Sequence, residues 1–215
     1  MALLFTQDWD VIRGKEDEYD AFVAKTFIPR CNALGLIGVG GFFVQVGVGP
    51  RIVSLKRVES LSNLCTIVSS DDFRNLKNEL KNYVSNYTSK VLEPTGRIQC
   101  SNYAIQKGVW KLNQYWDILP GMRDKYSDFI TNTYLPTLEN LDYLEVTGGW
   151  NVLIGGFSEI IAELTVKDAF DIGRLLDDET FRELNFKLQR EYVTNYKSRI
   201  LRTTPRFDEP RWFRL

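Results

Sequence analysis

Polar side chains that could bind a ligand lie in two short segments of similar composition, residues 7–10 and 113–117. The candidate ligand-binding residues are Gln7, Trp9, Asp10, Asn113, Gln114, Tyr115, Trp116, Asp117 and, further along the chain, Glu163. Amide groups both donate and accept hydrogen bonds, carboxylates accept them, and tryptophan and tyrosine combine an apolar ring with one polar atom. This combination favours the binding of a small, partly apolar molecule.

The two glutamines interrupt apolar rows. Because successive side chains of a strand point to opposite faces, Gln7 lies between Phe5 and Trp9 on one face of an expected strand. Gln114 lies beside Trp116 on the corresponding face of a later strand. A buried glutamine without partners costs about 1–3 kcal/mol. Each glutamine is therefore expected to contact either a ligand or a neighbouring strand or helix, and each tryptophan to be a core anchor or a pocket wall.

The acidic candidates allow more than one role. Asp10 and Asp117 end their expected strands, where a carboxylate can accept hydrogen bonds from a turn, cap the next helix or act as a general base. Glu163 lies in an expected strand among apolar residues, where it is either a perturbed carboxyl group or the partner of an arginine or lysine. Because Asn113, Tyr115 and Glu163 occur only in the second half of the chain, we expect that half to carry a chemical site if only one does. No matched set of acid, base and nucleophile is present, so catalysis stays an open question.

Histidine is absent from the 215 residues. Its absence excludes His-based catalytic triads, histidine general bases, His-ligated zinc and haem with a proximal histidine. Any general base has to be Asp, Glu, Lys or Tyr. Cys31, Cys65 and Cys100 are odd in number and lack CxxC spacing, which is typical of reduced thiols in a cytoplasmic protein. We therefore expect no metal and no cofactor.

The bulk composition is that of a soluble globular protein, with 26% charged and 44% hydrophobic residues. A net charge of −1 gives no overall attraction to nucleic acid or anionic lipid. Residues 1–10 lack the features of a signal peptide, and no apolar run is long enough to span a membrane. Residues 41–46 are only faintly similar to an RNA-binding strand motif. Nucleic acid and membrane are therefore not expected partners.

The chain repeats itself. Matching pairs include Trp9 and Trp116 at an offset of 107 residues, Gly40 and Gly148 at 108, and Tyr87 and Tyr196 at 109. Two one-residue insertions over a full repeat leave little room for chance. We predict two repeats, residues 1–98 and 111–207, joined by a linker at 99–110 and followed by a tail at 208–215.

Each repeat has the same predicted order of elements. In the first repeat these are a strand at Leu4–Val11, a helix at Glu16–Leu34 bent at Pro29, strands at Ile37–Val46 and Arg51–Val58, helices capped by Ser60 and Ser70 that reach Tyr87, and a last strand opening at Lys90. The order is β-α-β-β-α-β, the ferredoxin-like arrangement, in which helices cover one face of a four-stranded antiparallel sheet. The bare face must be buried, so the two sheets are expected to cover each other in a barrel-like core.

Several motifs of the first repeat carry a family resemblance. They are Tyr19-x-x-Phe22, Thr26-Phe-Ile-Pro29, Gly40-Gly-Phe42 and Ser70-Asp-Asp-Phe73. With the tandem βαββαβ units, they resemble the dimeric α/β-barrel superfamily, in particular its NIPSNAP-like and antibiotic-biosynthesis-monooxygenase-like members. The resemblance implies an α+β fold in which two ferredoxin-like sheets form a barrel within one chain, with ligands between sheet and helices or in the barrel. It implies no single activity, because the superfamily includes cofactor-free oxygenases, haem enzymes and ligand binders, and the missing histidine argues against the haem-binding branch.

The favoured function is binding of a small, partly apolar molecule in a pocket of the barrel. One alternative is a cofactor-independent monooxygenase-like enzyme, and another is a non-catalytic structural or assembly protein. Trp212 and Phe213 would be poorly placed in solvent, so we expect the tail to dock on the chain itself or on a partner subunit. The expected protein partner is therefore a second copy of the chain, bound through sheet edges or through this tail.

Overall fold

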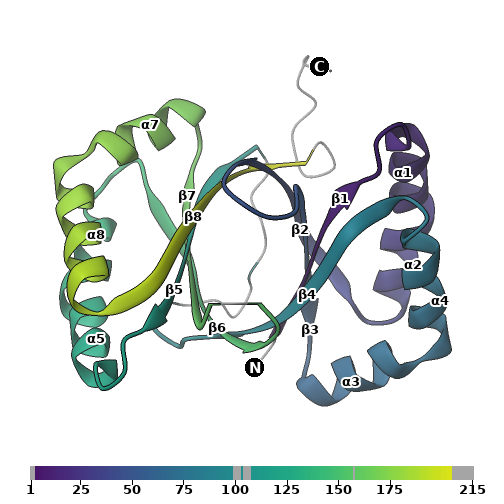
Figure 1. Ribbon diagram of the computed structural model, residues 1–215, viewed down its shortest axis with the longest axis horizontal. Helices are drawn as coiled ribbons and strands as arrows, with labels where there is room; N and C mark the ends of the chain where they lie inside the picture. Colours follow the sequence, from purple (N-terminus) through teal and green to yellow (C-terminus); the bar gives the residue numbers. More distant parts are fainter. Residues whose placement is uncertain (1–2, 99–102, 104–107, 157, 205–215) are drawn as a thin grey trace.

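Eight strands form one closed barrel with helices on two opposite sides (Figure 1). This computed structural model describes residues 3–98, 103, 108–156 and 158–204. The expected tail at 208–215, Cys100 and most of the expected linker lie outside these ranges. The strand order around the ring is β1-β3-β2-β8-β5-β7-β6-β4.

The two repeats contain the same elements in the same order. The first repeat consists of β1 (Leu3–Val11), α1 (Glu16–Phe22), the π-helical turn η1 (Val23–Phe27), α2 (Ile28–Ala33), β2 (Ile37–Val46), β3 (Ile52–Val58), α3 (Leu61–Ser69), α4 (Asp71–Leu80) and β4 (Val84–Pro94). The second consists of β5 (Trp110–Ile118), α5 (Arg123–Phe129), η2 (Ile130–Tyr134), α6 (Leu135–Glu139), β6 (Glu145–Ile154), β7 (Ile160–Val166), α7 (Ala169–Asp177), α8 (Glu179–Glu191) and β8 (Val193–Thr203). The predicted duplication of a βαββαβ unit is confirmed.

The two sheets close by pairing their edges. Val44 of β2 pairs with Leu201 of β8, and Leu92 of β4 pairs with Val152 of β6, so both junctions join different repeats. The faces without helices line a common lumen, where apolar side chains of both repeats pack together. Every strand is paired on both sides, so pairing with a second copy through a sheet edge would compete with the barrel itself.

Alternation along the strands separates two environments. On β1 the side chains that face the helices are Phe5, Gln7 and Trp9, whereas Leu4, which precedes Phe5, belongs to the cluster in the lumen. Each repeat has its own apolar cluster between sheet and helices, and the lumen holds a third. The barrel wall therefore divides the interior into three compartments.

Before Pro29, where the sequence predicts a bend, the helix continues through a π-helical turn. The amide of Ile28 donates its hydrogen bond to the carbonyl of Val23, five residues back, and Pro29 follows in the first turn of α2. Proline has no amide hydrogen and its ring crowds the carbonyl four residues earlier, so a wider turn directly before it lets the chain remain helical. Pro136 follows η2 in the same way.

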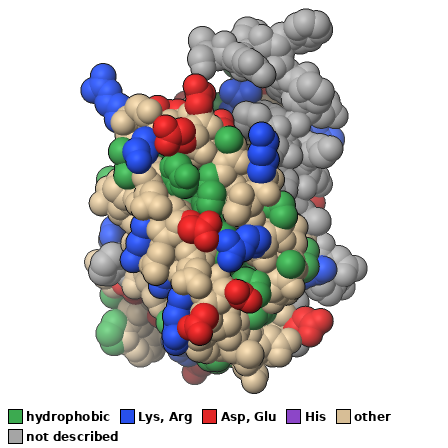
Figure 2. Space-filling model, turned by 90° about the vertical axis from the view of Figure 1, so that its right-hand side faces the viewer, with side chains coloured by type: hydrophobic (Ala, Val, Ile, Leu, Met, Phe, Trp, Pro, Cys, Tyr) green, Lys and Arg blue, Asp and Glu red, His purple; other side chains and the backbone are tan. Residues whose placement is uncertain are grey.

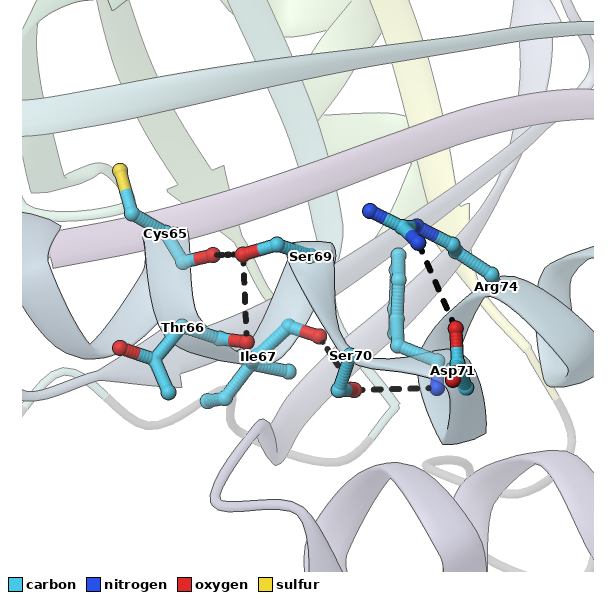
Figure 3. Close-up of polar contacts among 8 residues, drawn as sticks. Cys65, Thr66, Ile67, Ser69, Ser70, Asp71 and Arg74 are labelled. Carbon is cyan, nitrogen blue, oxygen red and sulfur yellow. Dashed lines mark hydrogen bonds and ion pairs between the residues drawn. The ribbon is translucent and has the colours of Figure 1, made fainter.

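The predicted helix caps are confirmed. Ser60 and Ser70 in the first repeat, and Asp168 and Asp178 in the second, each accept a hydrogen bond from the first turn of the following helix. Figure 3 shows the junction of α3 and α4, where Ser70 Oγ also donates to the carbonyl of Ile67 at 2.7 Å. Within the described ranges no helix is both long and apolar enough to cross a membrane.

The surface over the first repeat's helices carries no dominant charge. Figure 2 views this side of the molecule, where acidic, basic and apolar side chains are interspersed. Such a mixed surface gives no broad basic face of the kind that nucleic-acid backbones require.

The helix predicted to reach Tyr87 ends earlier, at Leu80, and that part of the prediction was wrong. Residues 84–94 form β4, and the ring of Tyr87 stacks on Trp9 with centroids 6.3 Å apart. The chain bulges at Asn86, which has a φ of 53° and donates to Asp10 at 2.8 Å. This tertiary stacking and hydrogen bonding hold the segment in the sheet. Asn195, with a φ of 55°, repeats the bulge in β8.

These two asparagines allow a test of the bulge. Asn86→Ala loses the bond to Asp10 and leaves a β-carbon in the left-handed region, so it should lower the free energy of unfolding by about 1–2 kcal/mol. Asn86→Gly loses the same bond without that steric cost and should be less destabilising. Urea denaturation of both variants, with the matched pair at Asn195, measures the difference. A glycine variant less stable than the alanine variant would contradict this account.

Candidate functional site

The predicted site residues do not form one site. Gln7, Trp9, Gln114 and Trp116 lie between the sheet and the helices of their own repeats. Asn113, Tyr115 and Glu163 point into the lumen, and the two aspartates lie at strand ends. The barrel wall separates the first group from the second.

Asp10 and Asp117 each form hydrogen bonds both to the hairpin of their own repeat and to the asparagine at the bulge of its last strand. Asp10 accepts hydrogen bonds from the backbone amide of Arg51 and from the side chain of Asn86, both at 2.8 Å. Asp117 accepts from the amide of Glu159 at 2.7 Å and from Asn195 at 2.8 Å. In both repeats the two carboxylate oxygens are thus used to hold the backbone. This geometry matches a structural role better than proton transfer.

Glu163 is the centre of a buried polar group in the lumen. Its Oε2 accepts from Lys111 Nζ at 2.9 Å and from the hydroxyl of Tyr103 at 2.7 Å. Lys111 also donates to the Tyr103 oxygen at 2.6 Å. All three side chains are buried. The cost of burying the carboxylate is offset by its contacts with a cation and a hydroxyl group.

A second polar layer in the lumen contains Tyr115 and Asn113. Burial raises the pKa of Tyr115 to about 12, and the Arg199 guanidinium lies 5.4 Å from its ring centre. Arg199 lies 3.9 Å from Asp8, to which Lys90 is also ion-paired. Among the described residues, the Oδ1 atoms of Asn113 and Asp8 have no hydrogen-bond partner. Within the described ranges, no group of three or more acidic or cysteine side chains could hold a metal ion.

In the second repeat the buried glutamine is fully satisfied by neighbours. Gln114 Nε2 donates to Asn185 at 2.7 Å and to the hydroxyl oxygen of Tyr196 at 2.6 Å, and its Oε1 accepts from Tyr134 at 2.7 Å. The cavity between this sheet and its helices measures about 30 Å³ and is lined by Trp116 and Tyr134 among others. Such a volume is about that of one water molecule.

The first repeat has a larger cavity in the same place. It measures about 170 Å³ and lies between the bent helix and strands β2 and β3. Trp9, Tyr19 and Cys31 line it, together with Ser54 and Lys56. Of the described residues that line this cavity, Lys56 is the only one with a charged side chain. We name it the first-repeat cavity.

Lys56 is buried beside neutral partners. Lys56 is only 2% exposed to solvent. Its Nζ donates hydrogen bonds to Gln7 Oε1 at 2.5 Å and to Ser54 Oγ at 2.8 Å. Gln7 in turn donates to the hydroxyl oxygen of Tyr87. No acidic side chain of the described ranges lies within 4.0 Å of Nζ, and the nearest aromatic ring, Phe27, is centred 5.0 Å away.

Burial sets the protonation properties of this group. Removal from water lowers the pKa of Lys56 from 10.5 to about 8, opposed only by the nearby thiol of Cys31. Burial likewise raises the pKa of Cys31, and it raises the pKa of Tyr87 to about 12. A lysine in this state can act as a base or a nucleophile near neutral pH.

The two repeats differ in the residues that surround Gln7 and Gln114. At positions corresponding to Lys56, Ser54, Cys31 and Phe27, the second repeat has Leu164, Ala162, Leu138 and Tyr134. Tyr134 donates a hydrogen bond to Oε1 of Gln114, whereas Lys56 donates the corresponding hydrogen bond to Oε1 of Gln7. We expected a chemical site in the second repeat, but the larger cavity between sheet and first helix, and the buried lysine that lines it, lie in the first repeat. The second repeat has instead a more open pocket of about 510 Å³ over α8, lined by Asn185 and Tyr196 among others.

Lys56 is not among the candidate residues predicted from the sequence. A signal was present, because Lys56 occupies the helix-facing row of β3 at a position where the second repeat has Leu164. A charged residue at a position where the other repeat has a core residue is a candidate functional group.

Titration of Lys56 should appear in the pH dependence of stability. Its pKa is about 8 when folded and 10.5 in the reference state, so between these values the unfolded chain binds more protons and stability rises with pH. Relative to Lys56→Met, the wild-type free energy of unfolding should rise by about 2–3 kcal/mol from about pH 7 to about pH 10. Urea denaturation at fixed pH values measures this difference. A difference independent of pH would show that Lys56 titrates normally.

No protein-family model matches this sequence, and no curated protein sequence matches it. Solved structures, in contrast, match nearly the whole chain. A candidate monooxygenase from Fusobacterium nucleatum superposes with a TM-score of 0.62 at 12% identity, over 94% of this chain and 92% of that one. A candidate monooxygenase from Lactobacillus acidophilus gives 0.61 at 8% identity, over 93% and 92%. A variant of the chlorite dismutase from Candidatus Nitrospira defluvii gives 0.63 at 8% identity, over 95% and 92%.

These likenesses are too distant in sequence to carry over an activity, but they extend over both repeats and the barrel. The fold predicted from the sequence resemblance is confirmed: two ferredoxin-like βαββαβ repeats close into one α/β barrel within a single chain, a fold similar to that of these solved structures.

Proposed function

We propose that the protein binds a small, partly apolar molecule in the first-repeat cavity. A cavity of about 170 Å³ is slightly larger than an engineered cavity of about 150 Å³ that accommodates benzene. It lies between sheet and helices, one of the two ligand positions that the resemblance implies. The size suits a molecule with a single ring or a short branched chain.

The observation that carries this proposal is the buried amine of Lys56, which has no acidic partner among the described residues. Burying an ammonium group is costly unless a counter-charge or several hydrogen bonds compensate it. Its contacts with Gln7 and Ser54 are both to neutral oxygens. A ligand with a hydrogen-bond acceptor would supply a third contact. Trp9 and Tyr19 would provide apolar walls on the helix side.

An oxygenase without a cofactor is the second candidate. Two of the similar solved structures are named as candidate monooxygenases, and another as an anthrone oxidase-like protein. The observation in its favour is again Lys56, because a base in an apolar cavity could remove a proton from a bound substrate. Oxygen uptake with bound phenolic compounds, abolished in Lys56→Met while binding persists, would support it.

Ligand binding should depend on the space at Cys31. Compounds with one ring and one acceptor are expected to stabilise the wild-type protein in a thermal-shift screen, by about 2.7 kcal/mol at a concentration 100 times the Kd. Cys31→Leu introduces the leucine that the second repeat has at this position, fills the cavity and should abolish the stabilisation.

The matched control is Cys65→Leu, the same exchange at an exposed cysteine outside the cavity. It should bind as the wild type does. Equal binding by Cys31→Leu, or no stabilisation by any compound of this class, would disprove the proposed site.

A further inference from the structure

We propose that Lys56 captures small neutral aldehydes or ketones covalently, as an imine on its Nζ. This inference deepens the binding function proposed above and rests on it, since the carbonyl compound must first enter the first-repeat cavity. It adds a chemical class of ligand and a bond to the chain.

The geometry leaves the amine available. Lys56 lines the cavity, and both of its hydrogen-bond partners are neutral acceptors, Gln7 and Ser54. Lys111, the other buried lysine of the core, is held by Glu163 at 2.9 Å and by Tyr103 at 2.6 Å. Attack by Lys111 would require the breaking of a buried ion pair, whereas attack by Lys56 requires none.

The protonation state also favours reaction. With a pKa of about 8, about 20% of Lys56 is the neutral amine at neutral to slightly basic pH, compared with about 0.1% of an exposed lysine. Only the neutral form has a lone pair to attack a carbonyl carbon. The advantage is therefore on the order of 100-fold before access is considered.

The reaction balances without an oxidant. The Nζ lone pair forms a bond to the carbonyl carbon as the C=O π pair moves to oxygen, and one proton passes from nitrogen to that oxygen to give a carbinolamine. The nitrogen lone pair then forms C=N as the hydroxyl leaves with a proton, so one water is released. Ser54 Oγ, which lies 2.8 Å from Nζ, is placed to relay these protons. Gln7 Oε1 accepts a hydrogen bond from the amine, and from the N–H of the protonated imine, and so orients the nitrogen.

The cavity selects the carbonyl class. Because Lys56 provides the only charged side chain among its described lining residues, an oxo acid would bring a carboxylate without a second cation to pair with it. A neutral aldehyde or ketone has no such cost. The protonated imine keeps a positive charge at the position of the ammonium, 5.0 Å from the Phe27 ring centre, where a cation–π contact stabilises it.

Reductive trapping tests the inference. The full-length protein is incubated with benzaldehyde and sodium cyanoborohydride, and intact mass with peptide mapping locates the benzyl groups. Lys56 should carry at least about tenfold more label than any exposed lysine, and Lys111 should carry none. The rate of labelling at Lys56 should rise with pH around an apparent pKa near 8. Label spread evenly over exposed lysines would overturn the inference.

Two controls separate this inference from the binding proposal. Lys56→Arg keeps a cationic hydrogen-bond donor but cannot form an imine, so it should lose the specific label. Benzyl alcohol has the same ring without a carbonyl group, and its binding is followed by thermal shift. If benzyl alcohol stabilises the wild type and Lys56 is not labelled, covalent capture is wrong while binding stands. If neither compound stabilises the protein and no label appears, both proposals fail.

Discussion

Each four-stranded sheet has one face without helices, and the rest of the structure depends on burying that face. The repeats do so by pairing edge to edge at β2–β8 and β4–β6, which turns two open sheets into one ring. The helices then cover only the outside, and each helix layer packs on its own repeat. Three separate interiors result, and the candidate residues are distributed among them according to strand alternation.

Closure holds both repeats in nearly the same geometry, so their differences are informative. Both bury a glutamine beside a tryptophan, and both stack that tryptophan on a tyrosine, Trp9 on Tyr87 and Trp116 on Tyr196. The second repeat completes its network with neutral groups and leaves only about 30 Å³ between its sheet and its first helix. The first completes it with Lys56 and keeps a cavity. A buried base where packing alone would suffice is the strongest functional sign in the molecule.

Much of the fold followed from local patterns. Offsets between repeats, period-two alternation and serine or aspartate caps predicted the strands, the helix starts and the bent first helix, because these depend on neighbours in sequence. The failure at Tyr87 had a tertiary cause: its stacking partner Trp9 lies 78 positions away in the chain. Alternation along the strands also correctly assigned Gln7 and Tyr115 to different sheet faces: Gln7 lies on the face covered by helices and Tyr115 on the face that lines the lumen. Alternation could not show that the barrel wall would separate the predicted site residues, or that Lys56 of β3 would reach Gln7 on the neighbouring strand β1.

The position of the ring junctions has a consequence for the two halves of the chain. A polypeptide with only residues 3–98 would retain the hydrogen-bonded core of one sheet but lose the strands that pair with β2 and β4. Its uncovered edges match those of an identical molecule, so two such fragments could assemble into the same ring by mutual exchange of edges. Size-exclusion chromatography of that fragment would show whether linkage in one chain is needed for assembly or only removes its dependence on concentration.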